Sequence, residues 1–376
     1  MKFLHVADIH LDYEQYKSKY RYMDFMRSFN WLIDYANTKE VDAFVMSGDL
    51  FHKRTADPYA MRWVEDAFNT LSCPTFIIEG NHEKSYFVDK ESWIDYLGAT
   101  SDVFLLDQSC ESIKCVRFCG IRYSGAQTNE IVLDFVDSLD KTDEFTVLML
   151  HAGLIGQVSH VGKLEEDTMA AIKDKIDYVA LGHIHKPYVF DDFVFNPGSP
   201  ENVSANEALY PHRGAILVEI TGKTFNYEFV VPPRRGFHRI NIDVDGFRSP
   251  ELIYDAVATV CKDETLKNDV IDMVISGEIT FSRSDINTKK IQEMLMETLT
   301  PLVAHVRNDA TPVGFGITVD ESQEKDIEKD VMLQVIRRDA RYRDKAEFWT
   351  AAALTVKDLS IAGETEDIIT YIGGAV

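Results

Sequence analysis

Short apolar runs alternate with amphipathic stretches along the first 233 residues of the chain. The apolar runs show no polar alternation and occupy residues 3–8, 43–49, 75–80, 103–106, 146–152 and 178–183. Such runs are typical of central strands that are covered on both faces. The stretches between them have the apolar spacing of helices and occupy residues 22–40, 58–72, 130–139 and 164–175. Strands that alternate with helices predict a layered α/β fold.

The pattern changes twice in the rest of the chain. Apolar runs at 186–198, 214–220 and 225–231 have no helical stretch between them and predict an antiparallel sheet. Two prolines follow at 232 and 233, before a basic cluster, and indicate a domain boundary. Beyond them the order strand, helix, strand, helix, strand predicts a small α+β domain, and the remaining residues are charged and helix-like. We therefore expect three parts, at 1–233, 234–319 and 320–376.

Composition limits the class of protein. Hydrophobic residues make up 45% of the 376 residues, which is enough for a sizeable core. No apolar run approaches the roughly 18–20 residues of a membrane span, and the N-terminal MKFLHVADIH predicts a first strand rather than a signal peptide. Five cysteines without regular spacing argue against a disulfide framework. Cys110, Cys115 and Cys119 are expected as small core side chains, with 112–121 as one strand, in a cytoplasmic protein.

Metal-binding types of side chain stand at the ends of five of the predicted strands. In chain order they are Asp8, His10, Asp49, Asn81, His82, His151, His183 and His185. In open α/β sheets, ligands bind beyond the carboxyl ends of the strands, so we expect these side chains to converge on one crevice. Asp-x-His and GNH are each weak signals alone and GHxH is a moderate one, while His5, outside the set, is expected to be an ordinary satisfied or solvated histidine.

The residue types suit two metal ions. Carboxylates, an amide oxygen and imidazoles together favour manganese, iron or zinc over calcium. The seven of these side chains other than His82 are too many ligands for a single tetrahedral zinc, which uses about four. They suffice for two ions if one carboxylate is shared, and Asp49 is the candidate bridge because it is central in chain order. Two ions close together can activate a water and clamp a phosphoryl group.

The motifs DIH, GDLFH, GNHE, LHAG and GHIH, in this order, resemble those of the calcineurin-like metallophosphoesterases. GDLFHKR and FNPGSPE are similar to motifs of one subfamily, the nuclease subunits that trim DNA double-strand breaks. The resemblance implies a two-sheet core with helices outside. The part at 234–319 resembles the capping domain of that family in position and size only.

The resemblance also implies roles for residues. One Mn²⁺ would be held by Asp8, His10, Asp49 and His185, and a second by Asp49, Asn81, His151 and His183. His82 would stabilise or protonate the leaving oxygen, and His52 would position the DNA backbone. The implied activity is a 3′–5′ exonuclease and single-strand endonuclease in which metal-bound hydroxide attacks directly. A small-molecule or cyclic-nucleotide phosphodiesterase is the alternative, and a scaffold with residual catalysis is a third hypothesis.

The charge of the chain conflicts with DNA binding. A formal net charge of -23 argues against nucleic acid, because phosphates attract Lys and Arg. Basic clusters exist at Lys53–Arg54, at 234–239 and at 337–343, and the second is the best candidate. The resemblance implies a partner, an SMC-like ATPase with a coiled-coil zinc hook, and a homodimer. Residues 320–376 are the candidate ATPase-binding segment, and 58–71 with 86–97 the candidate dimer face, although both could instead pack within the chain.

Overall fold

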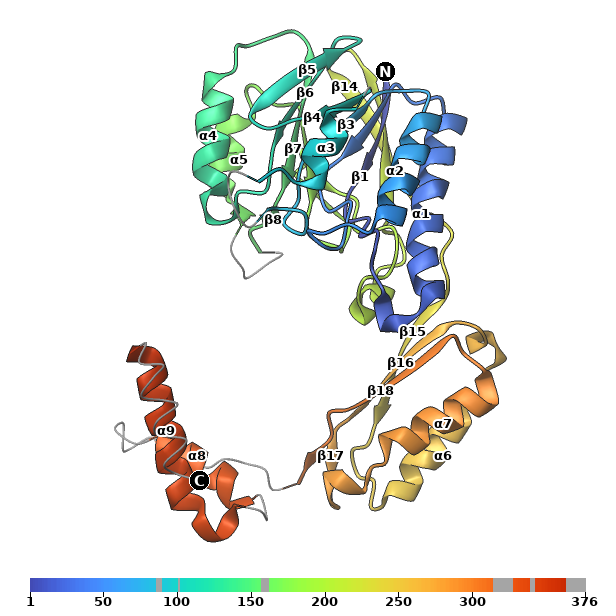
Figure 1. Ribbon diagram of the computed structural model, residues 1–376, viewed down its shortest axis with the longest axis vertical. Helices are drawn as coiled ribbons and strands as arrows, with labels where there is room; N and C mark the ends of the chain where they lie inside the picture. Colours follow the sequence, from blue (N-terminus) through green and yellow to red (C-terminus); the bar gives the residue numbers. More distant parts are fainter. Residues whose placement is uncertain (86–89, 101, 157–161, 314–326, 339–341, 363–376) are drawn as a thin grey trace. The chain divides into compact units, whose positions relative to one another are not determined.

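The computed structural model of this chain describes residues 1–85, 90–100, 102–156, 162–313, 327–338 and 342–362 (Figure 1). The chain divides into two compact units. The first comprises Met1–Ile242, Ala256–Val274 and Thr288–Arg307, and the second Asp243–Asp255, Ile275–Asn287 and Asn308–Val376. The boundaries expected at 233 and 319 stay predictions.

Two six-stranded sheets form the centre of the first unit. The first sheet has the order β14-β13-β1-β2-β3-β4 and contains β1 (Lys2–Val6), β2 (Ala43–Met46), β3 (Thr75–Ile77), β4 (Val103–Leu105), β13 (Ala215–Thr221) and β14 (Thr224–Val230). The second has the order β11-β12-β10-β7-β6-β5 and contains β5 (Ser109–Ile113), β6 (Val116–Ile121), β7 (Phe145–His151), β10 (Tyr178–Gly182), β11 (Tyr188–Phe190) and β12 (Val194–Asn196). Strands β1 to β4 run parallel, as do β6, β7, β10 and β12.

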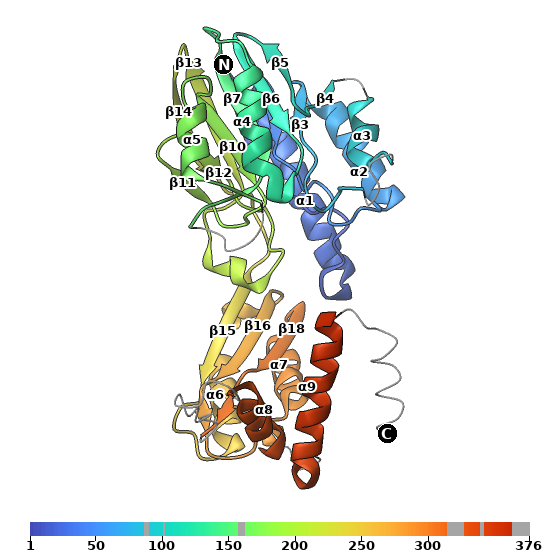
Figure 2. The same cartoon turned by 90° about the vertical axis from the view of Figure 1, so that its left-hand side faces the viewer.

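Helices cover the outer faces of both sheets (Figure 2). They are α1 (Lys19–Thr38), α2 (Pro58–Thr70) and α3 (Trp93–Gly98) beside the first sheet, and α4 (Thr128–Ser138) and α5 (Glu166–Ile172) beside the second. Alternate residues of β1 therefore serve two cores: Leu4 packs toward α1 and α2, and Phe3 packs between the sheets. Both faces of the central strands are buried, which explains their uniformly apolar sequences and confirms the two-sheet α/β fold.

Three local expectations were wrong. The later apolar runs do not form one antiparallel sheet, because the β11–β12 hairpin extends the second sheet while β13 and β14 extend the first. The run at 112–121 is not one strand, since Lys114 and Cys115 have φ angles of 48° and 64° and turn the chain between β5 and β6. That hairpin places Cys110 directly opposite Cys119, with the Cα atoms 4.1 Å apart, and the two form a disulfide rather than free core thiols.

The α+β part follows as expected. Its three-stranded sheet has the order β15-β16-β18, from Phe237–Asp243, Val270–Ser276 and Val303–Asn308, and its helices are α6 (Pro250–Val260) and α7 (Thr288–Leu299). Two further helices, α8 (Ile327–Arg338) and α9 (Ala346–Ala362), lie in the C-terminal segment. The expected segment also includes 320–326, 339–341 and 363–376, which lie outside the described residues. None of the helices in the described ranges combines the length and apolar character that crossing a bilayer requires.

Candidate active site

The candidate site lies beyond the carboxyl ends of strands from both sheets. Asp8 and His10 follow β1, Asp49 follows β2, and Asn81 follows β3. From the second sheet, His151 is the last residue of β7, and His183 and His185 follow β10. The strands end earlier than the apolar runs predict, so most of these side chains stand in loops. All seven predicted ligands come together, as their positions at strand ends led us to expect.

One group of side chains gathers around His10. Its Nε2 lies 3.0 Å from Nε2 of His185 and 3.8 Å from Oδ2 of Asp49. Ligand atoms of Asp8, His10 and His185 all lie within 4.8 Å of one another. The Asp8 carboxylate also accepts the backbone N–H of His183, at 2.9 and 3.1 Å from its two oxygens. This group corresponds to the first predicted metal position.

A second group gathers around Asn81. Its Oδ1 lies 3.0 Å from Nε2 of His151 and 2.9 Å from Nδ1 of His183. Nε2 of His151 is 3.3 Å from Oδ2 of Asp49. The same Asp49 oxygen therefore faces both groups, which is the place that a shared carboxylate would occupy.

His82 and His52 stand at the open side of these groups. The Nδ1 of His82 lies 2.8 Å from the carbonyl oxygen of His52. A carbonyl only accepts, so Nδ1 carries the proton and Nε2, 3.9 Å from Asp49, faces the candidate metal groups. The His52 ring stacks on Tyr13, with centroids 3.8 Å apart. His82 is partly exposed, with 34% of its side chain accessible, so a substrate can reach it.

The carboxylates at the centre are buried and close to several imidazoles. Burial raises the pKa of Asp8 to about 6, although His185 and His151 oppose this shift. Burial also raises the pKa of Asp49, but His151 and His10 outweigh it and hold that pKa below its ordinary value. Buried carboxylates need a compensating cation or hydrogen bonds. Two such carboxylates, an amide oxygen and converging ring nitrogens form a donor set that fits divalent metal ions.

Two glycines allow the loops to pack this closely. Gly48 has a φ of 87°, and a Cβ there would also press on the ring of His151. A Cβ on Gly80 would collide with the backbone nitrogen and carboxylate of Asp49. Close approach thus requires glycine at both positions, and the backbone conformation requires it at Gly48 as well.

Sequence reasoning missed two buried glutamates beside the site. Glu83 accepts the backbone N–H groups of Phe51 and Gly80, at 2.8 and 2.9 Å, and so joins the loops after β2 and β3. It immediately follows GNH, which was a usable signal. Glu207 accepts from Nδ1 of His185 at 2.8 Å. No periodicity marks Glu207, because it lies in a short turn of 3-10 helix, Ala205–Leu209.

The predicted basic cluster at 234–239 is less available than the sequence suggests. Arg234 donates to the carbonyl oxygens of Pro200, Pro211 and Arg213, and Arg235 forms a bidentate pair with Asp24. These guanidinium groups are engaged within the chain, so the cluster at 234–239 has less free charge than expected. In the third cluster, Arg341 lies outside the described residues.

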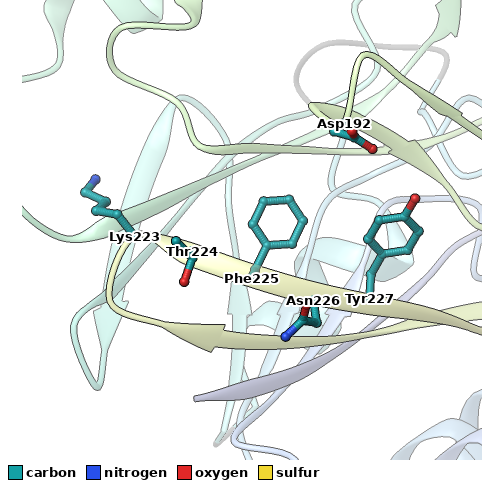
Figure 3. A pocket seen from close by; sticks show the side chains of 6 residues that line it. All are labelled: Asp192, Lys223, Thr224, Phe225, Asn226 and Tyr227. Atoms are coloured by element: carbon teal, nitrogen blue, oxygen red, sulfur yellow. The ribbon is translucent and has the colours of Figure 1, made fainter.

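A separate hollow of about 480 Å³ lies along β14 (Figure 3). It is lined by Asp192, Lys223, Thr224, Phe225, Asn226 and Tyr227. Lys223 there already pairs with Asp177, at 2.8 Å. None of these six residues belongs to the candidate site, and they offer no group of metal ligands.

The fold and the site define a class of enzyme. Residues 1–187 match the sequence model of the calcineurin-like phosphoesterase family, and this part of the chain belongs to that family. The domain implies divalent metal binding and the hydrolysis of phosphate esters.

Similar proteins narrow the class further. The chain is 26% identical to the DNA double-strand break repair protein Mre11 of Archaeoglobus fulgidus, over 79% of this chain and 76% of that protein. It is 25% identical to the protein of the same name in Methanocaldococcus jannaschii, over 79% of this chain and 89% of that one. A third, in Haloferax volcanii, is 27% identical over 73% of this chain and 61% of the relative.

Proposed function

We propose that this protein is a Mn²⁺-dependent DNA nuclease of double-strand-break repair, with 3′–5′ exonuclease and single-strand endonuclease activity. The observation that carries the proposal is the convergence of seven ligand-type side chains from five strands in a phosphoesterase domain. The choice of DNA as substrate is supported by the relatives, which are named as double-strand break repair proteins and match most of this chain.

Two Mn²⁺ ions per chain would share the site. Asp8, His10, Asp49 and His185 would hold one, and Asp49, Asn81, His151 and His183 the other. Bound ions of this kind supply a nucleophilic water near neutral pH and neutralise charge on the phosphoryl group. The chain provides the ligands on loops fixed by two buried sheets, so little rearrangement is needed on binding.

His82 would manage the proton on the leaving oxygen. Its Nδ1 proton is held by the carbonyl oxygen of His52 at 2.8 Å, so Nε2 is the nitrogen that faces a substrate. When the ring is protonated, both ring nitrogens are donors, and Nε2–H can donate to the departing 3′ or 5′ oxygen. His52, stacked on Tyr13, would contact the DNA backbone from the same side.

We propose that the protein acts with two kinds of protein partner, an SMC-like ATPase and a second copy of itself. The SMC-like ATPase would bind the C-terminal helices, where Val335 and Phe348 are exposed. A homodimer would form through α2, where Tyr59 is exposed, and through residues 90–97. Residues 86–89 of that face lie outside the described ranges.

With a net charge of -23, the affinity of the chain for DNA without the ATPase should be weak and should fall steeply with salt. We expect a cytoplasmic enzyme, although the disulfide between Cys110 and Cys119 is more typical of proteins in oxidising compartments.

Digestion of an end-labelled linear duplex tests the proposal. Purified protein is incubated with Mn²⁺, with Mg²⁺ and with a chelator, alongside His82→Ala. We expect Mn²⁺-dependent shortening from the 3′ end, reduced by about 10²–10⁴-fold in the variant, which is the usual contribution of a general acid. Mn²⁺ binding should be retained in the variant, since His82 is not among the proposed ligands.

The outcomes separate the alternatives. Cleavage of a simple phosphodiester without digestion of DNA, even after the ATPase is added, would replace the nuclease by a small-molecule or cyclic-nucleotide phosphodiesterase. Digestion that His82→Ala leaves unchanged would keep the nuclease and remove the assigned role of His82. Absence of any hydrolysis, with stable binding to the ATPase, would favour the scaffold hypothesis.

A further inference from the structure

The carboxylate of Glu207 lies behind one of the candidate ligands, on the side away from the site. Its Oε1 is 2.8 Å from Nδ1 of His185, while Nε2 of the same ring faces His10. A carboxylate only accepts hydrogen bonds, so Nδ1 of His185 carries the proton when the two are joined. The lone pair of His185 is then on Nε2, the nitrogen that points into the first group of candidate ligands.

The Glu207 side chain is itself fixed by four donors. Oε1 accepts from His185 and from the backbone N–H of Ser204, at 2.8 Å in each case. Oε2 accepts from the hydroxyl of Ser199 at 2.7 Å and from the backbone N–H of Val203 at 2.9 Å. Only 5% of the side chain is exposed. A buried carboxylate with four donors around it holds one orientation, and so does the ring that it touches.

The backbone that carries Glu207 is also held in place. The buried Arg213 donates from Nε to the carbonyl oxygen of Glu207 at 3.3 Å and from Nη1 to the carbonyl oxygen of Ser199 at 2.8 Å. Ser199 belongs to the segment FNPGSPE, which the ligand set leaves without a role. These contacts suggest a role for the segment, because Ser199 holds the carboxylate of Glu207, which in turn holds His185.

From this geometry we infer that Glu207 is a positioning residue for the metal centre, which sets the orientation and the tautomer of His185. Supporting residues of this kind typically change metal affinity by about 10–100-fold when they are replaced. The inference rests on the proposed function only in taking His185 as a metal ligand.

Glu201 supplies a matched control in the same segment. It is a buried glutamate as well, but its carboxylate pairs with Arg21 at 3.1 Å and accepts from the backbone N–H of Asn202. Neither of these two partners is a candidate ligand. Replacement of Glu201 therefore tests the loss of a buried carboxylate without the loss of support for His185.

Calorimetric titration with MnCl₂, without DNA, compares wild type, Glu207→Gln and Glu201→Gln. In either orientation, the NH₂ group of glutamine meets at least one N–H donor, either those of His185 and Ser204 or that of Val203, so Glu207→Gln should loosen the hold on the ring of His185. We expect its Kd for one of two Mn²⁺ ions to rise by about 10–100-fold. Glu201→Gln should lower the melting temperature of the metal-free protein and leave both Mn²⁺ affinities unchanged. The Nδ1–H resonance of His185, present in wild type, should be lost or shifted only in Glu207→Gln.

If Glu207→Gln does not fold, Ser199→Ala serves instead, because it keeps the carboxylate and removes one of its supports. Ser199→Ala should raise the Kd for the same Mn²⁺ ion, as Glu207→Gln does. Mn²⁺ affinities in Glu207→Gln and Ser199→Ala that equal those of wild type, or no Mn²⁺ binding in wild type, would overturn the inference. If wild type binds Mn²⁺ more tightly than Glu207→Gln but does not cut DNA, the nuclease proposal is wrong and the role of Glu207 stands.

Discussion

At the scale of single residues, the candidate ligands have unusual backbone conformations. Asp8, His10, Asp49 and His183 have φ angles of 55°, 53°, 54° and 87°, in the left-handed region that non-glycine residues avoid. Each such residue costs on the order of 1–3 kcal/mol and persists only where its surroundings hold it. In this chain the buried strands, together with the hydrogen bond from the backbone N–H of His183 to Asp8, hold these conformations in place. Strained residues on three loops, after β1, β2 and β10, thus direct their side chains to one place.

His5 has a different role, and its titration should be visible in stability. It is fully buried, and its Nε2 donates to the carbonyl oxygen of Leu181 while Tyr178 donates to Nδ1, both at 3.0 Å. Burial lowers its pKa to about 3, although the bond to Leu181 opposes this shift. The unfolded chain therefore binds a proton more readily than the folded one. Stability from neutral His5 is fully present above its ordinary pKa of 6.5 and is lost as the pH falls toward 3.

Denaturant unfolding from pH 7.5 to pH 4 measures this effect. We expect the unfolding free energy of wild type to fall with decreasing pH more steeply than that of His5→Gln, which cannot titrate. The difference should accumulate to the order of several kcal/mol at the acidic end of the window. Parallel curves for the two proteins would show that His5 titrates normally in the fold.

At the scale of elements, the loops after β2 and β3 are in direct contact at Asp49 and Gly80. A methyl group on Gly80 would collide with the backbone of Asp49, which cannot move without displacing the shared carboxylate. Glu83 holds the same two loops together through the N–H groups of Phe51 and Gly80. The geometry of the site thus depends on two loops keeping one mutual position.

Gly80→Ala should therefore impair catalysis more than stability. Displacement of a reacting group by about 1 Å can cost about 10²-fold in rate, whereas overpacking costs about 1–3 kcal/mol of stability. For Gly80→Ala we expect kcat on a simple phosphodiester to fall by at least about 10²-fold, with a modest fall in melting temperature. Gly222→Ala is the control, because its φ of 63° strains an alanine while the added Cβ meets no other atom within 4 Å, so it can lower stability without pressing on a loop of the site. A Gly80→Ala enzyme as active as Gly222→Ala would contradict the argument.

At the scale of the whole molecule, the described C-terminal helices offer apolar side chains to solvent. Phe348 is 46% exposed and Val335 is 41% exposed, whereas Ala346 and Thr350 of α9 are buried. Exposed apolar anchors on helices are the usual feature of a segment that lies in the groove of a partner. Under the proposed function, these are the side chains that we expect to contact the ATPase.

Val335→Asp and Phe348→Asp test this arrangement. Both variants should lose capture by the SMC-like ATPase in a pull-down while keeping hydrolysis of a simple phosphodiester and the melting temperature of wild type. Leu133→Asp is the control, since Leu133 is 38% exposed on α4 of the catalytic domain. Retained capture by both C-terminal variants, or an equal loss in Leu133→Asp, would rule out the segment as the docking site.

The sequence by itself determined where the central strands β1, β2, β3, β7 and β10 lie, because burial on both faces makes these strands uniformly apolar. It also determined which residues end those strands, and thereby gathered all seven candidate ligands. It placed the α1 and α2 helices to within a few residues, since Asp57 and Pro58 mark where α2 begins. These features are local, so periodicity and capping residues reveal them.

Only the tertiary structure decided the contacts between segments that are distant in sequence. Periodicity does not say that β13 joins β1 while β12 joins β10, because either hairpin satisfies the same pattern. It likewise gives no sign that Glu207 stands behind His185, or that Cys110 faces Cys119. The order of strands in each sheet and the course of the loops set these distances, and they are fixed by the packing of the whole fold.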